Sequence, residues 1–286
     1  MQISLHDPRY VYEISDTIVA ESGSSYELAD KIGSGGNSAV YECIDRTGTQ
    51  YAVKFLLRFS KKSTDRFAQE IKLMKIVNHP HLIKYVDSGT VEAISLCGKN
   101  RKQVEIKFVI MEKSDNNLLD YLKKNPSIDY DVYAPQFRGL CEALSVLHQH
   151  AIHRDIKPEN ILIKGETWVL SDFGLCEFLA EEDHLDLTGD NEKVGPIFWM
   201  SPEAINCAYF ANDEIGTFSD VFQICAVFAL VLTHKHPGGI ISEDDTLNTT
   251  PPIRDLIFRS MSNDKAKRPQ DGAELTMQFN KATYGS

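Results

Sequence analysis

The chain has 286 residues, of which 42% are hydrophobic, enough apolar material to bury a sizeable core in one large domain or two lobes. Its 30 basic residues stand against 41 acidic ones, and the formal net charge of -11 disfavours general attraction to nucleic acid or to an anionic membrane. The six cysteines form no CxxC pair, which favours free thiols in a reducing compartment over a disulfide framework or a structural zinc site.

The first 25 residues, which we call the N-terminal extension, contain one short stretch that is typical of a strand. It comprises Tyr10, Val11, Tyr12 and Ile14, and the following run Ser-Gly-Ser-Ser at 22–25 predicts a turn or a flexible joint. No basic region followed by an apolar run is present, so no cleavable signal is predicted. We interpret the N-terminal extension as a packing element and keep a docking segment as the alternative.

A glycine-rich turn follows at residues 33–36, between apolar segments that predict two strands. Glycines let backbone amides approach phosphate oxygens without interference from a Cβ atom, although a plain hairpin turn shows the same pattern. The next predicted strand, at 50–55, carries Lys54, and a helix is predicted over 65–77 with Glu70 beside its apolar face. Taken alone, Lys54 is typical of a solvated strand lysine. Beside a phosphate-binding turn it becomes a candidate cation for phosphate.

Several later segments predict helices or turns but contain no candidate catalytic residue. The stretch 91–107 is longer and more polar than a hairpin needs, and its basic tip at 98–102 fits a solvated turn or a docking site. Residues 118–123 and 132–150 predict helices whose apolar side chains belong to a core. The apolar run 224–232 predicts a buried helix too, because a membrane span needs about 20 residues.

The chemistry concentrates at residues 153–174. The segment 153–162 is HRDIKPENIL, an apolar strand follows, and the segment 171–174 is SDFG. One aspartate of such a pattern can hold an attacking hydroxyl while the other holds a metal ion, as a metal-assisted transfer to a hydroxyl requires. A two-carboxylate hydrolase formed by Asp155 and Asp172 is the alternative. It leaves Lys157, Asn160 and Lys54 without a role.

These segments resemble the catalytic-loop and metal-binding signatures of the protein kinase family almost letter for letter, and the resemblance covers roughly residues 26 to 280. It implies that Asp155 orients the substrate hydroxyl and accepts its proton, while Lys157 stabilises the transferring phosphoryl group. It also implies that Asn160 and Asp172 bind Mg²⁺, with Mn²⁺ as the alternative ion.

The same resemblance implies an ATP site. Lys54 is expected to contact the α- and β-phosphates and to pair with Glu70. Ser38 stands where the glycine-rich pattern GxGxxGxV has its third glycine, which is a mild departure. The other implied nucleotide-binding residues are Ile32, Gly33 and Gly35 in the loop, Val40, Ala52 and Leu162 against adenine, Met111 as gatekeeper, Glu112 and Ser114 in the hinge, and Asp172.

The segment 175–194 is rich in acidic residues, and a solvated loop is its ordinary interpretation. By resemblance, an activation-loop phosphate commonly neutralises the arginine before the catalytic aspartate, here Arg154, and the corresponding loop position holds Glu192. We therefore predict that Glu192 pairs with Arg154 and that loop phosphorylation, at Thr188 for instance, is not needed for activity. A carboxylate carries a charge of about -1, whereas a phosphate carries about -1.5 to -2. We therefore expect this pairing to replace the activation-loop phosphate only in part.

Residues 195–203 resemble the end of the kinase activation segment. Pro196 stands where Ser/Thr kinases usually have Thr, whereas Lys157 is typical of Ser/Thr kinases. We therefore predict Ser/Thr specificity and keep dual specificity as the alternative. Glu203 is expected to pair with Arg268, which disfavours a kinase for small alcohols or sugars. Asp220 is expected to cap its helix and to hold the catalytic loop.

The sequence thus predicts an α+β protein with the two-lobed protein kinase fold, in which a small antiparallel lobe of five strands and one main helix precedes a larger, mainly helical lobe. We expect the N-terminal extension at 1–25, the N-lobe at 26–111, the hinge at 112–114 and the C-lobe at 115–286, with ATP in the cleft. The predicted function is transfer of the γ-phosphate of ATP to Ser/Thr hydroxyls of protein substrates and of the kinase itself, in the cytoplasm. A regulatory protein partner is consistent with this prediction, and a catalytically weak pseudokinase scaffold is the rival.

Overall fold

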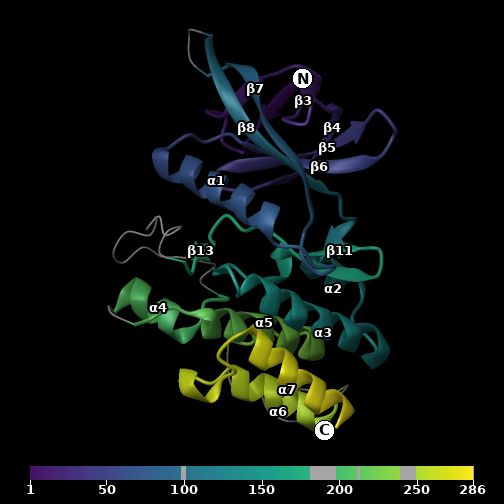
Figure 1. Ribbon diagram of the computed structural model, residues 1–286, viewed down its shortest axis with the longest axis vertical. Helices are drawn as coiled ribbons and strands as arrows, with labels where there is room; N and C mark the ends of the chain where they lie inside the picture. The colour runs from purple at the N-terminus through teal and green to yellow at the C-terminus, as the bar shows by residue number, and fades with distance from the viewer. Residues whose placement is uncertain (98–100, 181–197, 211–212, 239–248, 286) are drawn as a thin grey trace. The chain divides into compact units, whose positions relative to one another are not determined.

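The computed structural model describes residues 1–97, 101–180, 198–210, 213–238 and 249–285. The chain divides into two compact units, which are described separately. Unit 1 comprises Met1–Lys75 and Ile83–Ser114, and unit 2 comprises Ile76–Leu82 and Asp115–Ser286. Unit 1 is built on a sheet and unit 2 mainly on helices (Figure 1), which confirms the predicted α+β class.

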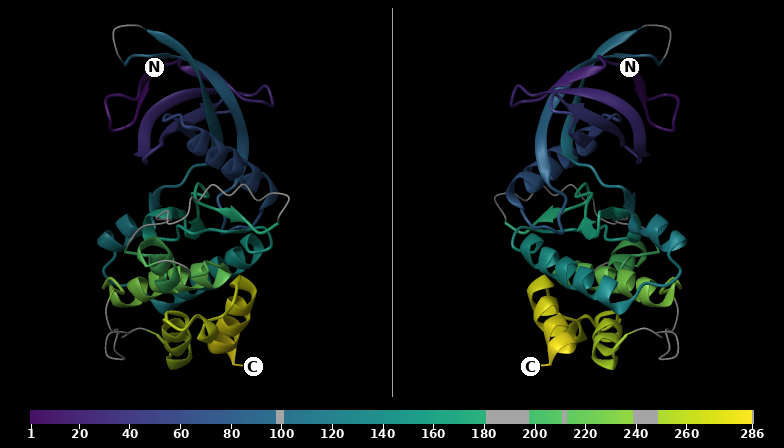
Figure 2. Two further views of the ribbon diagram at one scale, coloured as in Figure 1. Left: turned by 90° about the vertical axis from the view of Figure 1, so that its left-hand side faces the viewer. Right: turned by 90° about the vertical axis from the view of Figure 1, so that its right-hand side faces the viewer.

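Unit 1 contains one antiparallel sheet of eight strands, in the order β1-β2-β7-β8-β6-β5-β4-β3. The predicted number of five is wrong, because the N-terminal extension adds β1 and β2 at one edge and β3 at the other. Figure 2 shows this part of the chain, in purple, beside the other strands of the unit. The strands are β1 (Gln2–Ser4), β2 (Val11–Glu13), β3 (Thr17–Val19), β4 (Ser25–Ser34), β5 (Ser38–Asp45), β6 (Gln50–Leu56), β7 (Tyr85–Ser95) and β8 (Lys102–Glu112).

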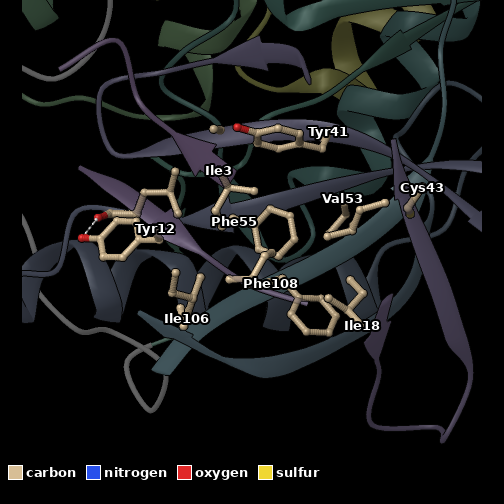
Figure 3. Close-up of a cluster of buried hydrophobic side chains, with 14 of the residues drawn as sticks. Ile3, Tyr12, Ile18, Tyr41, Cys43, Val53, Phe55, Ile106 and Phe108 are labelled. Carbon is tan, nitrogen blue, oxygen red and sulfur yellow. Dashed lines mark hydrogen bonds between the residues drawn. The ribbon is translucent and has the colours of Figure 1, made fainter. Parts of the chain in front are cut away.

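The sheet of unit 1 is covered on both faces. Helix α1 (Lys61–Ile76) lies along one side (Figure 1), and Lys54 of β6 faces it. Because strand side chains alternate between faces, Val53 and Phe55 point the other way. There they join a buried cluster to which the N-terminal extension contributes, and Figure 3 shows its Ile3, Tyr12 and Ile18 with Phe55, Phe108 and their neighbours. The extension therefore supplies part of the core of unit 1.

Unit 2 holds the remaining helices and two small sheets, β12-β11-β9 and β10-β13. Its strands are β9 (Asn116–Asn117), β10 (Ala151–Ile152), β11 (Ile161–Lys164), β12 (Thr167–Leu170) and β13 (Glu177–Phe178). Its α-helices are α2 (Leu118–Lys124), α3 (Tyr130–Leu147), α4 (Pro202–Tyr209), α5 (Thr217–Thr233), α6 (Pro251–Ser260) and α7 (Gly272–Tyr284), and short 3₁₀ helices span Pro158–Asn160 and Lys265–Lys267.

Helix α3 is the centre of the core of unit 2. Its Phe137 stacks on Phe228 of α5, with ring centroids 3.9 Å apart, and meets Phe279 of α7 edge-on at 6.4 Å. The first residue of α7 must be small, because a Cβ atom on Gly272 would lie 2.3 Å from the backbone nitrogen of Ser145 in α3. The apolar run predicted as a buried helix forms the second half of α5, and no helix among the described residues is long and apolar enough to cross a membrane.

A buried ion pair connects α4 to the segment before α7. The guanidinium of Arg268 donates from Nη1 to Oε1 of Glu203 at 2.8 Å and from Nη2 to Oε2 at 3.0 Å, and both side chains are almost fully buried. Ser219 donates to the same carboxylate at 2.6 Å. Burial acts to raise the pKa of Glu203, but the hydrogen bonds from Arg268 and Ser219 outweigh it and lower the pKa.

We expect Arg268→Met to lower the free energy of unfolding by about 3 to 5 kcal/mol, because the substitution leaves the Glu203 carboxylate buried without its counter-charge. The double variant Arg268→Met/Glu203→Leu should lose less than Arg268→Met alone, since no charge then remains buried. Lys267→Met, which breaks an exposed pair with Asp264, is the matched control and should cost less than about 1 kcal/mol. Denaturant unfolding measures all three, and a loss below 1 kcal/mol for Arg268→Met would contradict the account.

Candidate active site

The backbone of the catalytic loop in unit 2 is held by one buried carboxylate. Asp220, on α5, accepts the backbone N–H of His153 at 2.6 Å and that of Arg154 at 2.8 Å, one with each oxygen. Arg154 has a φ of 70°, in the left-handed region that a non-glycine residue keeps only where its surroundings hold it. At the start of α5, Ser219 makes the capping hydrogen bond that was expected of Asp220, because its Oγ accepts the N–H of Gly216. Asp220 therefore fixes the loop.

Asp220 is oriented in turn by a histidine. The backbone N–H of Gly272 donates to Nδ1 of His148 at 3.0 Å, so this nitrogen carries no proton and the ring is the neutral Nε2–H tautomer. Nε2 lies 3.0 Å from Oδ2 of Asp220 and donates to it. The carboxylate thus receives three hydrogen bonds in a site with no access to solvent.

The carboxylate of Asp155 lies between an ammonium and an amide. Nζ of Lys157 is 3.1 Å from both of its oxygens, and Nδ2 of Asn160 donates to Oδ2 at 2.8 Å and to the backbone carbonyl of Asp155 at 2.8 Å. Burial raises the pKa of Asp155, Lys157 opposes this shift, and the negative charge of Asp172 adds to it. Asp155 therefore has the environment of a proton acceptor with a raised pKa.

Asn160 and Asp172 carry the oxygen atoms that suit a magnesium ion. Both amide hydrogens of Asn160 point to Asp155, so its Oδ1 is the atom on offer to a metal. Ser171, beside Asp172, donates its backbone N–H and its hydroxyl to the carbonyl of Asn160 at 2.8 and 2.9 Å, which ties the two segments together. No cluster of three His, Cys, Asp or Glu suited to a metal occurs among the described residues. One carboxylate and one amide still fit Mg²⁺, which usually keeps water and phosphate oxygens as its other ligands.

The side chain of Arg154 pairs with a strand residue. Its Nη1 donates to Oε2 of Glu177 at 2.6 Å, and β10 pairs with β13 so that Ile152 lies opposite Glu177. The Nε atom of Arg154 is buried and has no hydrogen-bond partner within the described part of the chain. The predicted partner Glu192, and Thr188, lie outside the described residues, so that pairing stays a prediction. Glu177 already supplies one counter-charge to the guanidinium.

In unit 1, Lys54 and Glu70 form a buried ion pair with Nζ 2.6 Å from Oε1. Lys54 comes from the centre of β6, where it lies opposite Val40 on one neighbour and Val109 on the other. Glu70 comes from the buried side of α1. The sheet therefore fixes the lysine, whereas the position of the glutamate depends on the position of the helix.

The glycine-rich turn leaves its backbone accessible. A Cβ atom on Gly33 or Gly35 would come no closer than 3.6 Å to another atom, and on Gly36 it would meet nothing within 4 Å. The fold of the turn itself therefore does not require glycine. An open backbone of this kind fits a ligand that approaches closely, as phosphate oxygens do.

The other residues implied for nucleotide binding occupy both units. In unit 1, the N–H of Glu112 donates to the carbonyl of Lys84 at 3.2 Å, so any contact of Glu112 with adenine falls to its own carbonyl oxygen. In unit 2, Leu162 pairs with Val169 and Asn117 in the small sheet. The rest lie in unit 1. They are Ile32, which is exposed, and Val40, which is half-buried, near the turn, Ala52, which is buried in β6, Met111, the second-last residue of β8, and Ser114, two residues after that strand.

Sequence reasoning missed several residues that support the loop. Oε1 of Gln223 accepts the N–H of Ile156 at 3.2 Å, and its place three residues after Asp220 on one helix is the signal that could have found it. Glu177 is an acidic residue three positions after the SDFG segment, and only the pairing of β10 with β13 shows that it lies beside Arg154. The contact of His148 joins residues far apart in the chain, and no local pattern predicts it.

Comparison with known proteins identifies the family of this chain. The family model for the protein kinase domain matches residues 26–281. A probable serine/threonine-protein kinase of Encephalitozoon cuniculi is 28% identical over 253 residues, covering 88% of this chain and 43% of that protein. The receptor-like serine/threonine-protein kinase SD1-8 of Arabidopsis thaliana is 29% identical over 240 residues, covering 80% of this chain and 26% of that protein.

Serine/threonine-protein kinase pak-1 of Caenorhabditis elegans is 31% identical over 215 residues, covering 74% of this chain and 34% of that protein. The chain thus spans less than half the length of each of these three relatives. The family model, in contrast, extends over nearly the whole chain and includes the catalytic loop, the Lys54–Glu70 pair and the Glu203–Arg268 pair. The chain therefore belongs to the protein kinase domain family.

Proposed function

We propose that this protein kinase transfers the γ-phosphate of ATP, with Mg²⁺, to Ser/Thr hydroxyls of protein substrates and of itself. The observation that supports this most is the placement of Asp155, whose carboxylate accepts hydrogen bonds from Lys157 and Asn160 within 3.1 Å and is sensitive to the charge of Asp172. Unit 2 thus contains candidate groups for the base, the cation and the metal ligands of a phosphoryl transfer.

The proposed mechanism divides the work among these residues. Bound Mg·ATP supplies the phosphoryl group and neutralises part of its charge. Asp155 accepts a hydrogen bond from the substrate hydroxyl, orients its oxygen and takes its proton as that oxygen bonds to the γ-phosphorus, while the bond from this phosphorus to the β,γ-bridging oxygen breaks and ADP leaves. Lys157 offers positive charge to the transferring group, and Oδ1 of Asn160 and the carboxylate of Asp172 would hold the metal. Most of the catalytic effect then comes from positioning and electrostatics.

The nucleotide is assigned mainly to groups of unit 1. Lys54 places its ammonium on the α- and β-phosphates, and Glu70 keeps that ammonium charged and oriented. The open glycine turn offers backbone amides, and the segment 112–114 acts as the hinge. We keep the proposed limits of 1–25 for the extension, 26–111 for the N-lobe and 115–286 for the C-lobe.

Ser/Thr specificity rests on Lys157, which lies beside Asp155 as expected of a cation that acts on the phosphoryl group. Pro196 lies outside the described residues, so dual specificity stays the alternative. A scaffold without activity is the rival, and the complete set of charged groups argues against it. No disulfide bond joins the cysteines in the part of the chain that the structure describes, which supports a reducing compartment such as the cytoplasm. Regulation by a protein partner remains part of the proposal.

The direct test is transfer of labelled phosphate from Mg·ATP to the chain itself and to a generic basic protein, comparing wild type with Asp155→Asn. We expect Asp155→Asn to lower transfer at least about 100-fold while ATP still binds, because the amide cannot take the proton. Lys164→Gln, an exposed cation of the same unit, is the control and should transfer normally. Mapping the labelled hydroxyls separates Ser/Thr from Tyr. Nucleotide binding without any transfer would favour the scaffold.

The raised pKa of Asp155 predicts the pH dependence of the reaction. Below that pKa the carboxyl group is protonated and cannot accept the hydroxyl proton, so kcat/KM should fall toward acid pH with a slope of one. Because burial and Asp172 raise the pKa, the fall should begin above the ordinary range of an aspartate. Glu166→Gln removes an exposed carboxylate and should leave the profile unchanged. An acid limb at the ordinary aspartate pKa would contradict the assignment.

A further inference from the structure

We propose that the N-terminal extension is an intramolecular brace that holds α1, and with it Glu70, in the position where Glu70 pairs with Lys54. Residues 1–25 precede the segment that the family model matches, so family membership implies no role for them. The inference goes beyond the proposed function, and it rests on that function only where its test measures reaction rates. Its basis is a set of contacts that all lie within unit 1.

The extension is firmly attached to the sheet. In β2, Tyr12 lies opposite Ser95 of β7, and in β3, Ile18 lies opposite Tyr26 of β4. It also buries six apolar side chains against the face of the sheet that points away from α1, namely Ile3, Leu5, Tyr12, Ile14, Ile18 and Ala20. Burial on this scale makes the extension part of the core, so it can serve as a fixed support.

The first contact with α1 is at the turn that leads into the helix. Residues 57–60 join β6 to α1, and the hydroxyl of Tyr12 donates to the backbone carbonyl of Leu57 at 2.9 Å in a buried site. The ring of Tyr12 also meets that of Phe59, with centroids 5.8 Å apart. Ser60 then accepts the N–H of Ser63 at 3.0 Å and so begins the helix. The extension thereby positions the point from which α1 starts.

The second contact is at the other end of the helix. Nζ of Lys75, in the last turn of α1, lies 3.5 Å from Oε2 of Glu21 and 5.2 Å from the centre of the Tyr85 ring. Glu21 is itself fixed to β7, because its N–H donates to the carbonyl of Ser88 at 2.8 Å and its carboxylate accepts the Ser88 hydroxyl at 3.2 Å. The Lys75–Glu21 pair is exposed, so it contributes less than the buried contact of Tyr12.

Glu70 lies between these two contacts. A helix that is held at both ends cannot tilt without breaking one of them, and a small tilt is enough to separate a carboxylate from an ammonium 2.6 Å away. The hydrophobic face of α1 alone, with Phe67, Leu73 and Met74, tolerates sliding better than a pair of directed polar contacts does. The brace is therefore a positioning element for the Lys54–Glu70 pair.

The test uses the full chain with the double variant Tyr12→Phe/Glu21→Gln, which removes the Tyr12 hydroxyl and the negative charge opposite Lys75 and keeps the buried ring. Hydrogen exchange in the absence of nucleotide should show backbone amides of α1 exchanging about three- to tenfold faster than in wild type, while amides of α3 and α5 are unchanged. Val19→Thr is the matched control, because this side chain of the extension is 57% exposed and should leave exchange in α1 as it is.

The kinetic arm asks whether the brace acts through Glu70. The double variant should lower kcat about three- to tenfold with little change in KM for the protein substrate. In a Glu70→Gln background the same double variant should have no further effect, because the pair that it positions is already absent. A general loss of stability would instead lower the rate by the same factor in both backgrounds.

Unchanged exchange in α1, or an equal loss of rate in both backgrounds, would overturn the brace. Faster exchange confined to α1 with a loss of rate that disappears in the Glu70→Gln background would establish it. If wild type transfers no phosphate at all, the proposed function fails by itself. The exchange measurement still decides the inference, since it requires neither ATP nor a substrate.

Discussion

The buried carboxylate of Asp220 is the constraint on which the candidate site depends. It accepts the N–H groups of His153 and Arg154, and it thereby stabilises the left-handed backbone at Arg154 just before Asp155. Without it, two backbone donors would be buried without an acceptor, which costs about 1 to 3 kcal/mol for each group. The neutral ring of His148 fixes its orientation. The direction of the Asp155 side chain therefore follows from a residue that lies outside the loop.

The two units use different means to position their charged groups. In unit 2, Asp155 and Asn160 lie on a short loop that is held by hydrogen bonds to Asp220 of α5 and from Ser171, the residue directly after β12. In unit 1, Lys54 is fixed by the sheet, but Glu70 is only as well placed as the helix that carries it. The N-terminal extension compensates for this difference, because it covers the sheet and contacts both the residues before α1 and the last turn of α1.

Much of the fold and of the site could be predicted from the sequence, because motifs with several residues at fixed spacing indicate where each residue lies as well as what chemistry it can perform. The pairing of Glu203 with Arg268 is of this kind. The predicted strand number is wrong although the stretch that forms β2 is typical of a strand, since β1 and β3, with three residues each, are too short for a period-two pattern to be recognised. The partners Glu177 and His148 escaped prediction because their contacts depend on tertiary packing, which no local spacing encodes. Glu192 lies outside the described residues, so its pairing with Arg154 is still a prediction.

The most direct test of the account is the effect of Asp220→Asn on phosphate transfer and on ATP binding, measured together. The asparagine amide puts a donor where the loop needs an acceptor, so the loop that orients Asp155 should loosen. The account predicts a fall in kcat of at least about tenfold, whereas the Kd for ATP, which is assigned mainly to Lys54 and other groups of unit 1, changes by less than about twofold. A variant with kcat within twofold of wild type would show that Asp220 does not set the catalytic geometry.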